Sequence, residues 1–146
     1  MPSSRSYPGV AISGGKIFVI GGFDGAHALQ TNDIYSPDQE SGAENPWTSG
    51  SPMPEGRYSM GMTSIADIIY IVGGKQLGNE ALPLLEYQPS SDSWEATPTL
   101  SQPWSGLAMT SMQFYVFAIG GTFNTQLSSL NLSYQAVYSI AIPLVK

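Results

Sequence analysis

Three glycine pairs divide this chain, and each pair ends a run of apolar residues. The runs cover 17–20, 69–72 and 116–119, and the pairs are Gly21-Gly22, Gly73-Gly74 and Gly120-Gly121. A tyrosine follows the first glycine of every pair by fourteen residues, at positions 35, 87 and 134. A spacing that recurs in three copies indicates an internal repeat, and a repeat of about fifty residues predicts an array of small structural units.

The same spacing continues upstream of the glycines. The residue sixteen positions before each pair is Arg5, Arg57 or Trp104, and an apolar residue precedes each of these by four positions. Counting from that apolar residue gives three units, 1–52, 53–99 and 100–146. The extra length of the first unit falls in the polar segment 36–46, as expected where length varies only in a loop.

Each unit contains four segments with the composition of β-strands. We expect strands at 7–12, 16–20, 31–35 and 47–51, then at 58–65, 68–72, 82–87 and 93–97, and finally at 106–111, 114–119, 128–133 and 137–142. Gly14-Gly15 and Ala66-Asp67 fit tight hairpin turns before the second strands. Those second strands are apolar at consecutive positions, which an antiparallel strand shows when both its faces are covered. The sequence therefore predicts an all-β fold of stacked four-stranded sheets.

The composition argues against several classes of function. The 146 residues carry a formal charge of -6 with only five Lys and Arg, which disfavours binding to nucleic acid or to a membrane surface. With no cysteine and one histidine, the chain offers no disulfide, no thiolate metal site and no cysteine nucleophile, so we expect no metal and no other cofactor. The lack of cysteines and of an apolar leader at the first residues favours the cytoplasm.

This pattern resembles the kelch repeat, a β-propeller blade of about fifty residues. The matching features are the glycine pair after an aliphatic and aromatic strand, the motif Met-Pro-x-x-Arg at 1–5 and 53–57, and the later Tyr and Trp residues. These residues are Tyr35 with Trp47 and Tyr87 with Trp94. The third unit departs from the pattern, because Trp104 replaces the arginine and no tryptophan follows Tyr134.

Three blades do not close a propeller, which has typically four to eight. An open arc exposes one apolar face at each end. The resemblance implies six as the common number, so we expect two copies of the chain to form a homodimeric six-bladed ring. The alternative is that the chain is a fragment of a longer propeller.

Candidate binding residues lie near the innermost strand and in the loops after the glycine pairs. In kelch domains that act as substrate adaptors, positions near the innermost strand contribute arginines that grip acidic peptides, and here those positions hold Tyr7, Ser59 and Gly106. Arg5 and Arg57 fit either an anionic ligand or the carbonyl and carboxylate groups between blades. The recurring tyrosines and tryptophans fit the blade core. The full candidate set for binding is Arg5, Tyr7, Phe23, Asp24, His27, Arg57, Ser59, Lys75, Glu80 and Trp104.

Three functions fit this sequence. The first is a scaffold that binds a protein or a small polar ligand through the propeller loops and the central channel. The second is a sugar-modifying enzyme similar to the mutarotases of the kelch family, for which Arg5, Arg57 and Glu80 would be the residues to substitute. The third is a half-propeller, evolved or designed, that retains no ligand. No catalytic motif is present, so we expect a binding protein rather than an enzyme.

Overall fold

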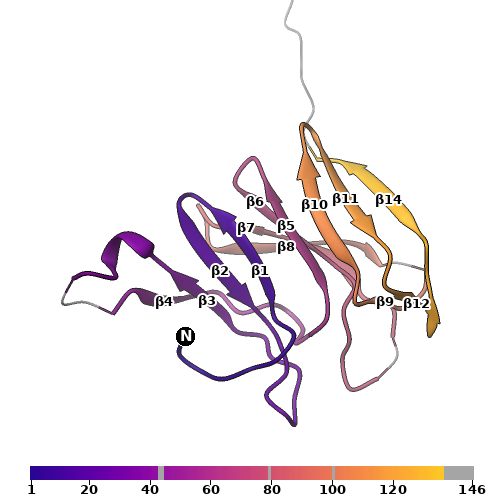
Figure 1. Cartoon of the computed structure of the whole chain (residues 1–146), viewed down its shortest axis with the longest axis horizontal. Helices are drawn as coiled ribbons and strands as arrows, with labels where there is room; N and C mark the ends of the chain where they lie inside the picture. Colours follow the sequence, from indigo (N-terminus) through magenta and orange to yellow (C-terminus); the bar gives the residue numbers. More distant parts are fainter. Residues whose placement is uncertain (43–44, 79, 100, 137–146) are drawn as a thin grey trace, which may run out of the picture.

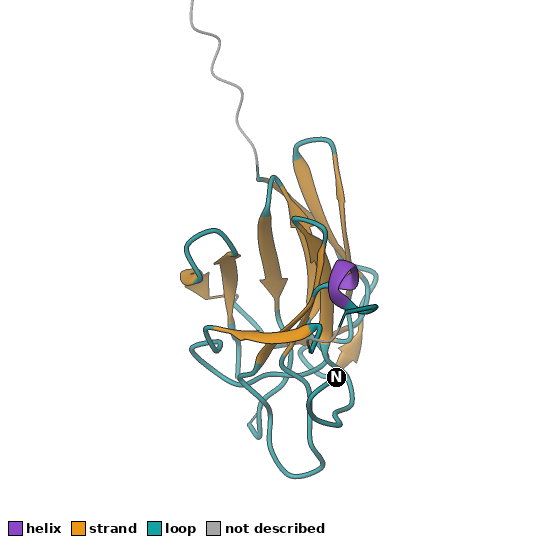
Figure 2. Ribbon diagram, turned by 90° about the vertical axis from the view of Figure 1, so that its left-hand side faces the viewer, coloured by secondary structure: helices purple, strands orange, loops and turns teal. Residues whose placement is uncertain are grey.

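A computed structural model of the chain describes residues 1–42, 45–78, 80–99 and 101–136. Its main sheets stand side by side in a fan, with the N-terminal sheet at the left and the C-terminal sheet at the right (Figure 1). Almost all of the regular structure is β, and the one helical element is a short 3-10 turn, η1 (Pro37–Gln39). The prediction of an all-β fold is confirmed, and Figure 2 shows the sheets edge-on with long loops at one end.

Two complete antiparallel sheets of four strands correspond to the first two units. The first sheet has the order β1 (Gly9–Ser13), β2 (Lys16–Ile20), β3 (Asn32–Tyr35) and β4 (Trp47–Gly50). The second has β5 (Gly61–Ile65), β6 (Ile68–Val72), β7 (Pro83–Gln88) and β8 (Ser93–Thr99). In both sheets each strand pairs with the next along the chain, which is the meander expected of a propeller blade.

The third unit forms a sheet of three strands within the described residues. Its strands are β10 (Ala108–Met112), β11 (Tyr115–Ile119) and β14 (Asn131–Gln135), and the fourth strand expected at 137–142 lies outside the described residues. A small additional sheet joins β9 (Trp104–Ser105), β12 (Thr122–Phe123) and β13 (Gln126–Leu127), which the sequence did not indicate. In the first two units only isolated bridges stand at this place, such as Ser6 with Phe23.

The first strand of every blade begins later than the sequence suggested. We expected these strands to start at Tyr7, Tyr58 and Gly106, whereas they start at Gly9, Gly61 and Ala108. The cause is a residue with positive φ two positions before each strand: 52° at Tyr7, 54° at Ser59 and 65° at Gly106. A left-handed residue cannot continue a strand, so pairing starts only after it.

The inner hairpins confirm the predicted turn chemistry. Gly14 and Gly15 join β1 to β2 with φ of 55° and 73°, and Ala66 and Asp67 join β5 to β6 with φ of 49° and 58°. Both turns need two left-handed residues in succession, as type I′ hairpins do. The second blade therefore makes with Ala66 the turn that the first makes with glycine.

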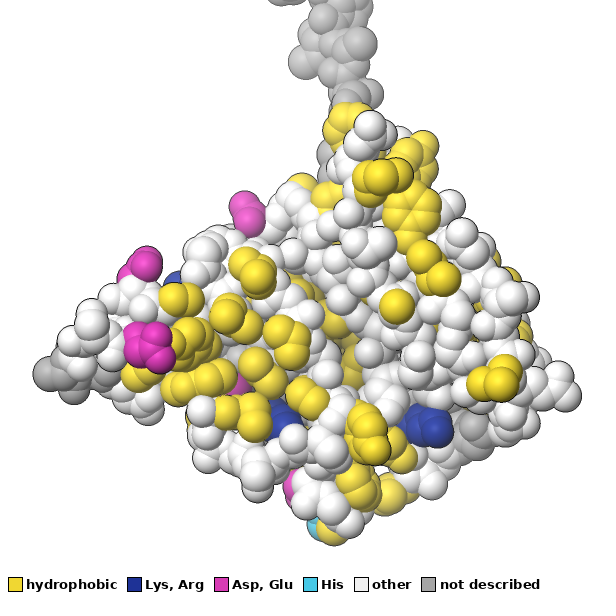
Figure 3. Space-filling view, viewed as in Figure 1, with side chains coloured by type: hydrophobic (Ala, Val, Ile, Leu, Met, Phe, Trp, Pro, Cys, Tyr) yellow, Lys and Arg dark blue, Asp and Glu magenta, His cyan; other side chains and the backbone are white. Residues whose placement is uncertain are grey.

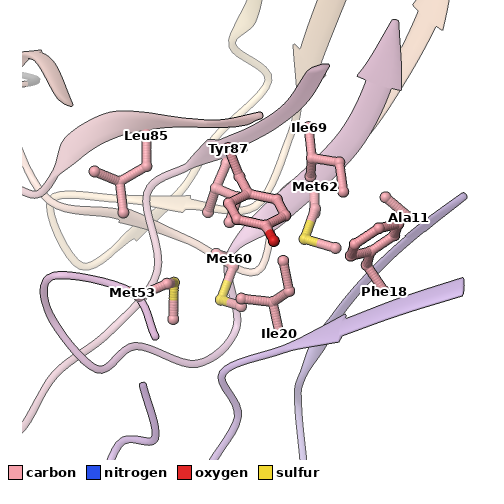
Figure 4. Packing of buried hydrophobic residues seen from close by; sticks show 10 residues of the cluster. Ala11, Phe18, Ile20, Met53, Met60, Met62, Ile69, Leu85 and Tyr87 are labelled. Carbon is pink, nitrogen blue, oxygen red and sulfur yellow. The ribbon is translucent and has the colours of Figure 1, made fainter. Parts of the chain in front are cut away.

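The core lies between the sheets rather than within any one of them. Side chains of the first and second sheets interdigitate in one cluster, in which Phe18, Ile20, Met62, Ile69 and Tyr87 are buried (Figure 4). A second cluster of buried residues joins the second and third sheets through Val72, Trp104, Leu107 and Ala118. Apolar burial between blades thus binds the arc together.

One of the tyrosines predicted to lie in the blade core is exposed. Tyr87 is 1% exposed and packs on Trp94 with ring centroids 4.7 Å apart, whereas Tyr134, its counterpart in the third unit, is 43% exposed. No tryptophan follows Tyr134 in the sequence, and the residues after position 136 lie outside the described part of the chain. The expectation that all three tyrosines belong to the blade core is therefore wrong for Tyr134.

The outer faces of the arc are apolar and open. In the first sheet Val10 and Ile12 are 53% and 65% exposed, and in the third sheet Met112 and Ile119 are 61% and 44% exposed. The space-filling view shows hydrophobic side chains gathered at the left of the molecule and at its upper right (Figure 3). A blade inside the arc has the corresponding faces covered.

Candidate functional site

The residue sixteen positions before each glycine pair donates a side-chain hydrogen bond to the carbonyl of the first glycine in that pair. Arg5 Nη1 donates to the carbonyl of Gly21 at 3.2 Å, Arg57 Nη1 to that of Gly73 at 3.2 Å, and Trp104 Nε1 to that of Gly120 at 2.7 Å. Arginine and tryptophan share only a long side chain with a terminal N–H donor. The constant spacing therefore records one hydrogen bond that ties the entry of each blade to the exit of its second strand.

Arg5 also forms a buried ion pair. Its guanidinium contacts the Asp33 carboxylate and the Thr31 hydroxyl, and the side chains of Arg5 and Asp33 are 0% and 7% exposed. An arginine that is buried and paired with a carboxylate in this way can serve the structure of the blade without binding a ligand. The carbonyl and carboxylate partners match the non-ligand alternative for Arg5, but they belong to the first blade itself and not to a neighbouring blade.

Arg57 is buried without a carboxylate partner among the described residues. Leu85 stands where the first unit has Asp33, so Arg57 donates only to the carbonyls of Gly73 and of Pro83, the latter at 2.9 Å. Its Nε and Nη2 have no acceptor among the described residues. Burial lowers the pKa of Arg57 to about 10, and the charge of Glu55 opposes that shift.

The three innermost candidates lie in a line of backbone hydrogen bonds that crosses from blade to blade. The Ser59 N–H donates to the Tyr7 carbonyl at 3.0 Å, and the Gly106 N–H donates to the Ser59 carbonyl at 2.7 Å. Tyr7, Ser59 and Gly106 occupy equivalent positions and share a left-handed backbone. The structure thus joins these three predicted site residues, and it does so through the main chain.

A second line of hydrogen bonds runs in the opposite direction. The Gly22 N–H donates to the Arg57 carbonyl at 3.0 Å, and the Gly74 N–H donates to the Trp104 carbonyl at 2.8 Å. A Cβ on Gly73 would lie 2.1 Å from the Trp104 oxygen, which explains why only glycine fits there. These two lines therefore give each joint between blades a backbone bond in each direction, and the first joint has two more, from the N–H groups of Met53 and Arg57 to the carbonyls of Gln30 and Leu29.

The loop candidates gather at one end of the blades. Asp24, His27, Lys75 and Glu80 are exposed, and Phe23 is half-buried. Asp24 accepts the backbone N–H groups of Ala26 and His27 at 2.8 and 2.7 Å, and these bonds lower the pKa of its carboxyl. Asp24 thereby shapes its own loop while its second carboxylate oxygen lies 3.6 Å from the His27 ring.

Phe23 belongs to an aromatic cluster that sequence reasoning found only in part. Its ring lies 5.0 Å from that of Tyr58, and the Tyr58 ring lies 6.5 Å from that of Tyr7. Tyr58 was not a candidate, because the first and third units have serine at its position. Its backbone pairs with Lys75, which places it at the same end of the molecule.

A groove of about 780 Å³ opens at this loop end. Its walls come from three segments, 27–31, 52–56 and 76–80, of which residue 79 is not described. The polar side chains along it include His27, Glu55, Gln76 and Glu80, and Gln76 donates to Glu55 at 2.9 Å. Of the predicted residues, the groove brings together His27 and Glu80, while Arg5 and Trp104 lie in the blade interior.

A carboxylate links the first and second blades at the outer edge of their joint. Asp92 Oδ1 accepts the Ser51 N–H at 2.6 Å and the Tyr87 hydroxyl at 2.7 Å, and Trp94 Nε1 donates to the Ser51 carbonyl at 2.9 Å. The hydrogen bonds from the Ser51 N–H and the Tyr87 hydroxyl lower the pKa of Asp92. This clasp holds the last strand of the first blade on the second blade.

The described residues lack the features of two other kinds of site. They contain no group of three or more side chains suited to hold a metal ion. They also contain no helix with the length and apolarity needed to cross a membrane.

Antiparallel four-stranded meanders that stack through apolar faces and pair at their innermost edges are the blades of a β-propeller. Residues 4–54 match the kelch motif family model. Similar curated proteins are kelch-like protein 36 of Bos taurus (32% identical, 83% of this chain and 20% of that protein) and beta-scruin of Limulus polyphemus (25%, 83% and 14%). Kelch-like protein 22 of Rattus norvegicus is 31% identical over 73% of this chain and 17% of its own length.

This chain belongs to the kelch-repeat family, as the resemblance predicted. It spans between 14% and 20% of the length of the relatives named above.

Proposed function

We propose that the chain is a protein-binding module whose three blades form half of a six-bladed ring, completed by a second copy. The observation that carries this proposal is the pair of backbone lines between blades, because each line ends in an unused group. At one end these are the Tyr7 N–H and the Arg5 carbonyl, and at the other the Gly121 N–H and the Gly106 carbonyl, none of which has a partner among the described residues. The Gly121 N–H fits the Arg5 carbonyl of a second copy, as Gly22 fits Arg57 and Gly74 fits Trp104.

The side chains at the open ends also complement each other in size. At the two internal joints a glycine receives a methionine of the next blade: a Cβ on Gly9 would lie 2.8 Å from Met62 Sδ, and one on Gly61 would lie 2.7 Å from Met109 Cγ. The equivalent open positions are Ala108 and Val10. At the open ends, Ala108 is larger than the glycine that it replaces and Val10 is smaller than the methionine that it replaces. The two changes compensate in volume, which supports direct contact between these two faces.

Ring closure is tested by the mass in solution across a dilution series, with Gly120→Ala as the key variant. A Cβ on Gly120 now meets only the Ser128 oxygen at 3.8 Å, whereas a Cβ on the equivalent Gly21 would lie 2.4 Å from the carbonyl of the next blade. We expect the wild type at twice 15.6 kDa and Gly120→Ala as a folded monomer. Gly14→Ala, which also changes a left-handed glycine but meets no atom within 4 Å, should stay dimeric.

Either a monomeric wild type or a dimeric Gly120→Ala variant would overturn the closure. The first result would assign the open faces to other blades or to another protein. The second would place the contact between copies somewhere other than the open faces.

The loop end is the part of this half-ring that is free to bind a partner. The two outer sheet faces are used by closure, and the residues before the glycine pairs are used inside the blades. The resemblance to kelch substrate adaptors supports a protein as the partner, and the groove between the loops supplies the space for it. Capture of peptides from a displayed random library, described below, tests this part of the proposal separately from closure.

A further inference from the structure

The aromatic cluster at the loop end is more exposed than its role in packing requires. Tyr7 is 66% exposed, and the rings of Tyr58 and Phe23 beside it are half-buried. The Tyr7 ring is tilted by 40° to the Tyr58 ring, and the Phe23 ring is tilted by 41° to the Tyr58 ring. The three rings therefore form an uneven surface rather than a flat stack. Tilted aromatic rings with polar tips are suited to receive an apolar side chain while they donate hydrogen bonds at their edge.

Tyr7 also has a backbone conformation that bulky residues avoid. Its φ is 52°, and the equivalent residues, Ser59 and Gly106, show that small side chains serve the same backbone position. A left-handed backbone is unfavourable for a residue with a bulky side chain. Because the Tyr7 side chain is mostly exposed, little burial offsets this cost. The blade geometry requires this backbone at all three positions, but it does not require a large side chain there, and of the three only Tyr7 has one.

Two backbone bridges connect the cluster to the walls of the groove. Phe23 pairs with Ala28, which lines the groove, and Tyr58 pairs with Lys75, next to the groove residue Gln76. Leu77, another lining residue, is 79% exposed. The rings and the groove are therefore neighbouring parts of one surface, built from the loops of the first two blades.

The charge of this surface is negative. Asp24, Glu55 and Glu80 are exposed on its loops, and Lys75 is the one exposed Lys or Arg side chain on the same loops within their described residues. Of the two arginines below the surface, Arg5 is neutralised by its ion pair with Asp33, whereas the charge of Arg57 interacts with Glu55 and offsets part of the negative charge. Together with Lys75 it leaves the surface with a smaller but still negative net charge. Acidic ligands would be repelled here, whereas Lys and Arg side chains would be attracted.

We infer that Tyr7, Phe23, Tyr58 and the adjoining groove form a docking surface for a basic peptide segment with an aromatic or large aliphatic anchor. The anchor packs on the rings of Tyr7 and Tyr58, and Lys or Arg residues beside it lie near the carboxylates of Glu55 and Glu80. This inference rests on the proposed function as a protein-binding module. It differs from recognition of acidic peptides by kelch adaptors, whose arginine positions are here Tyr7, Ser59 and Gly106.

The probe is a displayed library of random twelve-residue peptides, selected on the immobilised wild-type chain and sequenced. Selected peptides are then synthesised with a fluorophore, and their affinity is measured by anisotropy at low and high salt. The variants are Tyr7→Ser and Tyr58→Ser, because serine occupies both equivalent positions in other blades, so both should fold. Phe114→Ser is the matched control, since Phe114 is 49% exposed in the β10–β11 hairpin, away from these loops.

We expect the selected peptides to be enriched in aromatic or large aliphatic residues flanked by Lys and Arg. Their affinity should fall about tenfold or more in Tyr7→Ser, fall with added salt, and remain unchanged in Phe114→Ser. Enrichment of acidic peptides, or equal affinity for Tyr7→Ser and wild type, would overturn the inference and leave the protein-binding function intact. If no peptide is enriched, both the inference and the proposed binding function fail.

Discussion

Replacing Gly73 with alanine should weaken the joint between the second and third blades. Gly73 has φ of +64°, and an added Cβ would lie 2.1 Å from the Trp104 oxygen and 3.0 Å from its carbonyl carbon. The left-handed conformation alone costs alanine about 1 kcal/mol. The clash adds more, because the third blade must retreat by more than about 1 Å before the methyl reaches ordinary contact distance.

That retreat removes interactions that the structure identifies. The Gly74 N–H bond to the Trp104 carbonyl, 2.8 Å long, would break at a cost of about 1 kcal/mol. Loosening of the cluster of Val72, Trp104, Leu107 and Ala118 adds about 1–3 kcal/mol, as overpacking of a core does. We therefore expect Gly73→Ala to lower the free energy of unfolding by about 3–5 kcal/mol in total.

Gly14→Ala separates the effect of the close approach from the effect of φ. Gly14 has φ of +55° and no atom within 4 Å of the added Cβ, and the second blade already has Ala66 at this turn position. Its loss should stay at or below about 1 kcal/mol. Urea unfolding followed by tryptophan fluorescence measures both variants. Equal losses would refute the reasoning, because they would show that φ alone demands glycine at position 73.

Two further predictions concern charged groups. Arg5→Met should cost about 3–5 kcal/mol because it leaves the Asp33 carboxylate buried and unpaired, whereas Arg57→Met strands no charge and should cost less; urea unfolding of both variants checks the order, and an equal or reversed order contradicts it. The lowered pKa of Asp92 means that its carboxylate stabilises the fold at neutral pH and loses this effect as pH falls below the ordinary value of 3.8. Asp92→Asn should therefore be less stable than the wild type at pH about 7, with a gap that narrows toward pH about 3, and a gap independent of pH would show that Asp92 contributes no charge-dependent stability.

The strands were predictable because the sequence of each strand could be compared between three copies of the repeat. Where one unit was ambiguous, as at Ala66-Asp67, the other units showed a hairpin. The starts of the first strands were wrong because a tyrosine and a serine adopt φ values that the sequence pattern assigns to glycine. Gly106 at the same position of the third unit was the available signal, and it indicated a left-handed residue at all three positions.

The candidate site was only partly predictable. The fixed spacing of Arg5, Arg57 and Trp104 was visible, but its cause was not, because two residue types share one hydrogen bond to a glycine carbonyl. Tyr58 escaped notice because its role depends on rings from another blade, and the repeat pattern has serine there. Contacts between blades join residues about fifty positions apart, and a comparison of equivalent positions does not reveal which of them touch.

The two lines of hydrogen bonds between blades give the arc a direction. Its first blade offers the Tyr7 N–H and the Arg5 carbonyl, and its third blade offers the Gly121 N–H and the Gly106 carbonyl, so copies fit only head to tail. Such contacts make a ring when the rotation from copy to copy divides a full turn without a shift along the axis, and a helical filament when it does not. If the chain closes as we propose, a substitution that altered the angle between blades would therefore convert the two-copy ring into a larger ring or a growing polymer, even if every blade stayed folded.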